Sequence, residues 1–220
     1  MEQFFDILRF LVPFVILGFS IIMHEVSHGF VANALGDPTA KNAGRLTLNP
    51  IPHIDPIGSI LLPLLLIVLK AGFFIGWAKP VPVNPLNFKR RFDAIFVSIA
   101  GPISNLALAL VFGLFLRFFP QELQSPAMFA VFGYIVYINL LLAIFNLIPI
   151  PPLDGSHVLF HFLPRSYQQY QPFLMQFGII LIFFFVFFRP GFLSSLVNFA
   201  FEPLMGLSLI QFFLEFNYVF

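Results

Sequence analysis

The sequence predicts an all-α polytopic membrane protein. We expect a bundle of five to six transmembrane helices with a short membrane-associated β segment and a Pro-rich re-entrant region. Of the 220 residues, 59% are hydrophobic and only 10% are charged, whereas about a quarter of the residues of a soluble domain are charged. Apolar runs of about 20 residues, the length that crosses hydrocarbon, recur along the chain. Segments rich in Pro and Gly separate these runs.

Composition also limits the partners and the chemistry. The hydrophobic composition predicts a lipid bilayer environment, and the formal net charge of +1 implies no attraction to nucleic acid. The chain contains no Cys, so disulfides and thiolate metal sites are excluded. With no repeat and no soluble domain visible, we expect residues 1–220 to form a single membrane-embedded domain. Its core would cover about residues 5–165, and two C-terminal helices would cover about 172–218.

The first half of the chain is expected to contain one long helix and several irregular segments. The first apolar run covers about residues 4–35, and Gly36-Asp37-Pro38 ends it. Polar and apolar residues alternate over 45–49, which is typical of a short strand. The apolar run 57–75 could be a full span or a re-entrant hairpin. The many prolines of residues 76–85 favour an extended segment.

The second half contains four further apolar runs. They cover residues 94–119, 127–150, 173–188 and 192–213, and each predicts a helix. Together with the first run, and with the run 57–75 if it spans, they give five or six spans.

The cations indicate an orientation. Six of them flank or fill the segment between the first and third runs: Lys41, Arg45, Lys79, Lys89, Arg90 and Arg91. If residues 57–75 are re-entrant, all six lie on one face, which the positive-inside rule places in the cytoplasm. If that run spans, the cations divide between two faces. We favour the re-entrant hairpin.

The first apolar run carries the sequence His24-Glu25-Val26-Ser27-His28. Ionisable groups in hydrocarbon are costly, and they indicate function by default. On a helix, residues four apart lie on the same face, so His24 and His28 can bind one zinc ion. Glu25 can then reach a zinc-bound water and act as its general base. The sequence therefore predicts one catalytic Zn²⁺ per chain.

Catalytic zinc usually has three protein ligands, and Asp154 is the candidate third ligand. It follows the Pro-rich break at 149–152, where an Asp could also be an N-cap. His157 and His161 share a face with Asp154 if a helix begins there, so they are rival ligands. We expect these two histidines to be interfacial side chains that bond to the backbone.

Other polar residues at membrane depth are expected to hydrogen-bond between helices. They are Ser104, Asn105 and Asn139. Asn146 is different, because it lies on the break before Asp154, where its amide could donate to an oxyanion. We expect His53 and Asp55 to order a loop, with proton relay or metal entry as a more distant alternative.

Taken together, these motifs resemble the site-2 protease family of intramembrane zinc metalloproteases, in particular its small bacterial branch without a PDZ or CBS domain. The resemblance covers about residues 5–165. It is carried by His24–His28, by Gly44–Pro50 with His53 and Asp55, by Gly76–Asn84, by Gly101–Asn105 and by Asn146–Gly155.

The resemblance implies roles for individual residues. His24, His28 and Asp154 become the zinc ligands, Glu25 the catalytic base, and Asn146 a group that holds the substrate or its oxyanion. Residues 45–49 become an edge to which an unwound transmembrane substrate adds. The chain would be a multi-pass protein of the cell membrane, with its active site nearer the cytoplasmic side.

Two functions from different classes follow. The first is an intramembrane zinc metalloprotease that hydrolyses peptide bonds in or near transmembrane segments of membrane proteins. The alternative is a non-proteolytic membrane zinc-binding protein, or a pseudoprotease that captures membrane helices. Glu25 favours catalysis, because a carrier needs no carboxylate beside the first His ligand.

Overall fold

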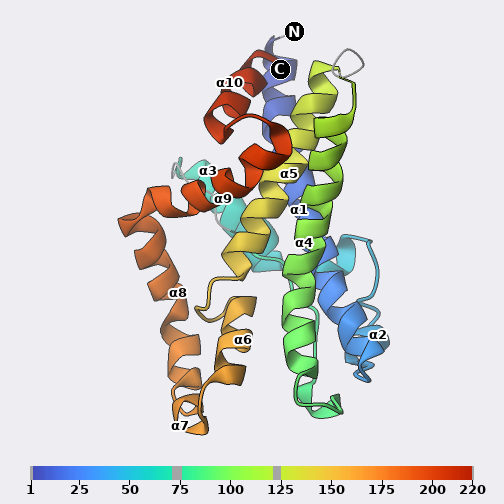
Figure 1. Ribbon diagram of the computed structural model, residues 1–220, viewed down its shortest axis with the longest axis vertical. Helices are drawn as coiled ribbons and strands as arrows, with labels where there is room; N and C mark the ends of the chain where they lie inside the picture. The colour runs from blue at the N-terminus through green and yellow to red at the C-terminus, as the bar shows by residue number, and fades with distance from the viewer. Residues whose placement is uncertain (1, 71–75, 121–124, 220) are drawn as a thin grey trace. The chain divides into compact units, whose positions relative to one another are not determined.

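The computed structural model describes residues 2–70, 76–120 and 125–219 (Figure 1). The chain divides into two compact units. One contains residues 1–20 and 102–220, and the other contains residues 21–101. Two long helices, α1 (Glu2–Ala34) and α4 (Asp93–Phe118), contribute residues to both units.

Three described helices are long and apolar enough to cross a membrane: residues 11–34 of α1, α4, and α5 (Pro126–Asn146). A fourth candidate is the pair α9 (Pro190–Met205) and α10 (Leu209–Val219), which is bent by 69°. The all-α polytopic class is therefore confirmed. The described residues give three to four candidate spans by length and composition, compared with the five to six that we expected.

The difference arises partly because two apolar runs form helices that are broken or short. The run 192–213 was expected to be one helix, but Gly206, with φ of 77°, ends α9 in the left-handed conformation. The Ser208 N–H then donates to Gln211 Oε1 (2.8 Å) at the start of α10. The helix α8 (Gln171–Phe188) has 18 residues, near the lower limit for a span.

The larger unit has an apolar core between α4, α5, α9 and α10. Its centre includes Val136, Phe201 and Phe212, all of them essentially inaccessible to solvent. Gly133 allows close packing here, because a Cβ at this position would overlap the Phe212 ring. Figure 1 shows α9 crossing α5, and these two helices are in contact.

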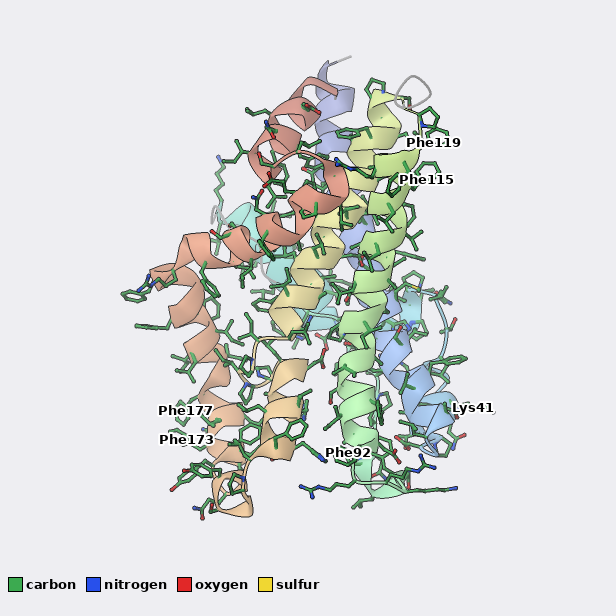
Figure 2. The ribbon with its side chains drawn as sticks, viewed as in Figure 1. Lys41, Phe92, Phe115, Phe119, Phe173 and Phe177 are labelled. Carbon is green, nitrogen blue, oxygen red and sulfur yellow. The ribbon has the colours of Figure 1, made fainter. Side chains whose placement is uncertain are left out.

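Aromatic side chains cover the outside of the same unit. Phe115 and Phe119 stack near the end of α4 with ring centroids 4.7 Å apart, and Phe173 and Phe177 lie on α8 with centroids 4.6 Å apart (Figure 2). Phe115, Phe173 and Phe177 are exposed. Exposed aromatic rings at this density suit a lipid environment rather than water.

A fully buried polar cluster connects three helices of this unit. Asn139 of α5 donates to Ser20 Oγ of α1 (2.9 Å), and Asn105 of α4 donates to Asn139 Oδ1 (2.8 Å). Interhelical hydrogen bonds of this kind hold membrane helices in register. The expected linking role of Asn105 and Asn139 is thereby confirmed.

Short helices complete the larger unit. After α5 the chain turns into α6 (Asp154–Phe162), and α7 (Arg165–Gln168) leads to α8. Gly155 is required at the start of α6, because a Cβ there would lie 2.8 Å from the carbonyl oxygen of Ile148 and closer still to that of Leu147.

The smaller unit is built from the C-terminal part of α1, the first turns of α4 and the irregular segments between them. Its short elements are α2 (Thr39–Asn42), a 3₁₀ turn at Ile51–His53, a π turn at Pro56–Leu61, α3 (Leu62–Val68) and a 3₁₀ turn at Pro85–Asn87.

Asp37, fully buried, joins the end of α1 to the residues before α4. Its carboxylate accepts hydrogen bonds from the Thr39 hydroxyl, from Asn87 Nδ2 (2.6 Å) and from the Asn84 N–H (2.7 Å). Burial alone would raise the Asp37 pKa, but these hydrogen bonds outweigh it and the net pKa is lowered. Asp37 therefore stays ionised and holds residues 84–87 in place.

Gly58, near the start of the apolar run 57–75, and Trp77, just after its end, lie close together. The Trp77 N–H donates to the Gly58 carbonyl (3.2 Å), and Ser59 Oγ donates to the Trp77 carbonyl (2.8 Å). A single span would carry its two ends about 30 Å apart. Residues 71–75 lie outside the described part of the chain, but the positions of Gly58 and Trp77 favour the re-entrant hairpin over the full span.

The strand that we expected at 45–49 is not observed. Residues 46–48 form bends, and the described residues contain no strand. The polar groups here bond elsewhere: Arg45 Nη2 donates to the Lys79 carbonyl (2.6 Å), and the Thr47 carbonyl accepts from His53 Nε2 (2.9 Å). These contacts to a loop and a side chain take the place of a ladder, which the alternating pattern alone cannot reveal.

Candidate metal centre

Two buried histidines on α1 face each other across one helical turn. His24 and His28 are 6% and 9% exposed, and their Nε2 atoms lie 3.0 Å apart. Nitrogens that bind the same tetrahedral zinc at about 2.0–2.1 Å are separated by roughly 3.3 Å. The spacing of four residues thus brings two ligand atoms to one point, as the sequence predicted.

The tautomer of His28 suits metal binding. Its Nδ1 lies 2.7 Å from the carbonyl oxygen of Val97 in the first turns of α4. A carbonyl oxygen only accepts, so Nδ1 carries a proton, and in the neutral ring Nε2 keeps its lone pair. Backbone carbonyls commonly orient metal-binding histidines in this way and raise their basicity.

Gly101 of α4 provides the space beside the two ligand atoms. A Cβ at this position would lie 2.6 Å from His24 Nε2 and closer still to His28 Nε2. Two imidazole nitrogens converging on a space that a single carbon atom would fill match the donor set and the size of a zinc site. The residues of this unit therefore fit a zinc ion.

Gly101→Ala is expected to weaken zinc binding by about tenfold or more, because the new methyl group displaces one or both imidazoles. The helix should tolerate the change, since Ala is the better helix former. Gly18→Ala on α1 is the matched control, because a Cβ there meets nothing within 4 Å. Zinc per chain after dialysis is the measurement, and equal zinc retention by both variants would contradict this role for Gly101.

Glu25 is held by the Pro-rich segment of the same unit. Its Oε2 accepts a hydrogen bond from the Val81 N–H (2.7 Å). This is the one hydrogen bond that the described residues make to the Glu25 carboxylate. The other oxygen, Oε1, can therefore accept a hydrogen bond from a further donor. The sequence did not predict this contact, because residues 25 and 81 are far apart along the chain.

The remaining predicted site residues belong to the larger unit. Asp154 is the first residue of α6, and Leu153 is the N-cap, so Asp154 does not cap that helix. Asn146 ends α5, where its Nδ2 donates to the Leu142 carbonyl (2.9 Å). His157 is exposed and His161 is half-buried. The roles of these four residues stay predictions.

His53 and Asp55 order their loop, as expected. Asp55 caps the π turn by accepting hydrogen bonds from the Ile57 and Gly58 N–H groups (3.0 and 2.7 Å). His53 is buried, and its carbonyl accepts from the Lys79 N–H (2.9 Å). Together with the bond from His53 Nε2 to Thr47, these contacts fix the loop.

Comparison with known proteins agrees with the chemistry of this site. The family described as Peptidase family M50 matches residues 119–185. The chain is 39% identical over 199 residues to the Bacillus subtilis protein named "Putative zinc metalloprotease YwhC", covering 86% of this chain and 87% of that protein.

Two further relatives carry similar names. "Putative zinc metalloprotease MJ0611" of Methanocaldococcus jannaschii is 33% identical over 156 residues, covering 70% of this chain and 72% of the relative. "Putative zinc metalloprotease Rip2" of Mycolicibacterium smegmatis is 31% identical over 165 residues, covering 74% of this chain and 61% of the relative. No solved structure matches the chain significantly.

Proposed function

Because this chain belongs to peptidase family M50, the site-2 protease family, we propose that it is an intramembrane zinc endopeptidase. It would cleave peptide bonds in or near the transmembrane segments of membrane proteins. The observation that carries the proposal is the pair of His24 and His28 Nε2 atoms, 3.0 Å apart, next to Glu25 on a helix apolar enough to span a membrane. Zinc is the cofactor, as the family and this donor set agree.

We assign His24, His28 and Asp154 as the zinc ligands. The two histidines supply neutral nitrogens, and an Asp carboxylate is an accepted third ligand for catalytic zinc. The two units would then act as one catalytic domain, because Asp154 belongs to the larger unit and the histidines to the smaller one. His157 is a weaker candidate ligand than Asp154, since its side chain is exposed.

In the proposed reaction Glu25 moves the protons. When bound, zinc polarises the scissile carbonyl and makes a water acidic enough to lose a proton near neutral pH. Glu25 accepts that proton at Oε1 while Val81 holds Oε2, and it then delivers the proton to the nitrogen of the leaving amine. Asn146 would bind the substrate backbone or the oxyanion through its amide hydrogens.

The experiment is cleavage of a panel of transmembrane-helix substrates by the purified protein in detergent or liposomes. We expect cleavage to stop after removal of the metal by a chelator and to return when zinc is added at about one ion per chain. A protein that binds zinc but cuts none of the substrates would favour the non-proteolytic alternative. Cleavage that survives complete zinc removal would contradict the proposed mechanism.

We also propose that the smaller unit faces the cytoplasm, with the active site nearer that side of the membrane. The native chain has no Cys, so the single variants Lys41→Cys, Arg90→Cys and Ser125→Cys can be probed with an impermeant thiol reagent on intact cells. Only the thiol at position 125, which precedes α5 at the other end of the α4 span, should be labelled from outside. Labelling of position 41 or position 90 from outside would overturn this orientation.

A further inference from the structure

We propose that residues 77–84 are a rigid positioning element for the general base, and that the backbone N–H of Val81 is the group that orients Glu25. The inference rests on the proposed function, because it assigns a positioning group for that same reaction. It begins with the composition of Pro80-Val81-Pro82. Proline has no backbone N–H, so these three residues have a single amide hydrogen, and the structure directs it to Glu25 Oε2 (2.7 Å).

The segment is fixed on both sides of Val81. The Trp77 N–H bonds to the Gly58 carbonyl, and the Asn84 N–H bonds to the buried carboxylate of Asp37. Lys79 is held twice, because its N–H donates to the His53 carbonyl and its own carbonyl accepts from Arg45 Nη2. With both neighbours of Val81 restricted in φ by their rings, little freedom is left to its amide.

The Val81 side chain fixes the segment to the helix that carries the site. Val81 is 7% exposed, and a Cβ at Gly29 would lie 2.8 Å from Val81 Cγ1. Gly29 therefore allows the segment to lie directly against α1, one turn after Glu25. This contact and the hydrogen bond to Glu25 act on the same helix, and together they set the position of the carboxylate relative to His24 and His28.

The same composition argues against a second role as a docking edge. In an extended chain the N–H groups of alternate residues point to opposite sides. The N–H groups of residues 77, 79 and 81 are all donated within the unit. The opposite side would be formed by residues 78, 80 and 82, two of which are prolines and offer no donor. A substrate strand cannot form a regular ladder there, so the segment positions a side chain and does not receive a substrate.

Val81→Pro tests the inference, because it removes one amide hydrogen and keeps an extended backbone. Two controls accompany it. Val81→Ala trims the side chain but keeps the N–H. Val83→Pro adds a proline to the same segment at an N–H for which the structure describes no partner.

We expect Val81→Pro to lower kcat by about tenfold to a hundredfold, since a small displacement of a catalytic group costs this much. KM and zinc content should stay near wild type, Val83→Pro should keep most of the activity, and Val81→Ala should lose clearly less activity than Val81→Pro. Wild-type kcat in Val81→Pro with a normal melting temperature would overturn the inference. So would an increase in kcat, which would identify residues 77–84 as an inhibitory strap.

A second measurement keeps the inference separate from the proposed function. In protein labelled with ¹⁵N-valine, exchange of the Val81 amide hydrogen with solvent should be about tenfold or more faster in Glu25→Ala than in the wild type, because a hydrogen bond to a carboxylate is lost. This readout needs no substrate. If the wild type cleaves nothing but the exchange rate changes, the proposed function fails and the contact stands. Unchanged exchange would reject the contact itself.

Discussion

Glu25→Gln is expected to keep its zinc and to lose at least about a hundredfold in turnover of a transmembrane-helix substrate. A positioned acid–base group contributes about a hundredfold to ten-thousandfold, and an amide can neither accept nor return the proton. The Gln side chain has nearly the same shape and can still accept the hydrogen bond from the Val81 N–H. The fold and the metal site should therefore change little.

The matched control for this change is Glu202→Gln. Glu202 is exposed on α9 and contacts Asn198 of the same helix (3.3 Å), so its conversion should leave both zinc content and turnover near wild type. Turnover and zinc per chain are measured on the same preparations. Wild-type turnover by Glu25→Gln at full zinc occupancy would reject Glu25 as the base.

The second large effect is expected on metal binding. His24→Ala and His28→Ala should each weaken zinc binding by at least about a hundredfold, because loss of a residue that merely orients a ligand already costs tenfold to a hundredfold. The melting temperature of the metal-free proteins, measured in parallel, separates loss of a ligand from loss of the fold. Full zinc retention by either variant in a folded protein would remove that histidine from the site.

The close pair of histidines on α1 could be predicted from the sequence because its signals are local. The spacing of His24 and His28 defines one helix face whatever surrounds it, and the desolvation cost of Glu25 in an apolar run marks it as functional. The ends of α1, α4 and α5 were predicted within a few residues for a similar reason. Gly36-Asp37-Pro38 and the Pro-rich break after Asn146 interrupt the apolar pattern directly.

The groups that support the site come from distant parts of the sequence, and no local pattern indicates them. The Val97 carbonyl and the Val81 N–H are backbone atoms, so their residue types carry no signal for the role. Gly101 was visible as part of Gly-Pro-Ile-Ser-Asn, but its importance depends on which side chains face it. The wrong prediction of a strand at 45–49 has the same cause. A strand needs a partner strand, and the sequence pattern of one segment does not show whether a partner is present.

The helix count differed because composition does not determine where an apolar run bends. The run 192–213 satisfies the hydropathy criterion throughout, yet Gly206 divides it into α9 and α10. For the run 57–75, the hydrogen bond between the Trp77 N–H and the Gly58 carbonyl favours a hairpin over a span. Both features depend on backbone conformation at one or two residues.

The central claim is that one zinc ion is held by His24 and His28 of the smaller unit and by Asp154 of the larger one. The zinc contents of Asp154→Ala and His157→Ala, measured side by side, test this claim most directly. The two changes are at the first and fourth residues of α6, so each serves as a control for the other. We predict that Asp154→Ala loses most of its zinc on dialysis, while His157→Ala keeps about one ion per chain. Full zinc in Asp154→Ala together with loss of zinc from His157→Ala would contradict the assigned ligand set.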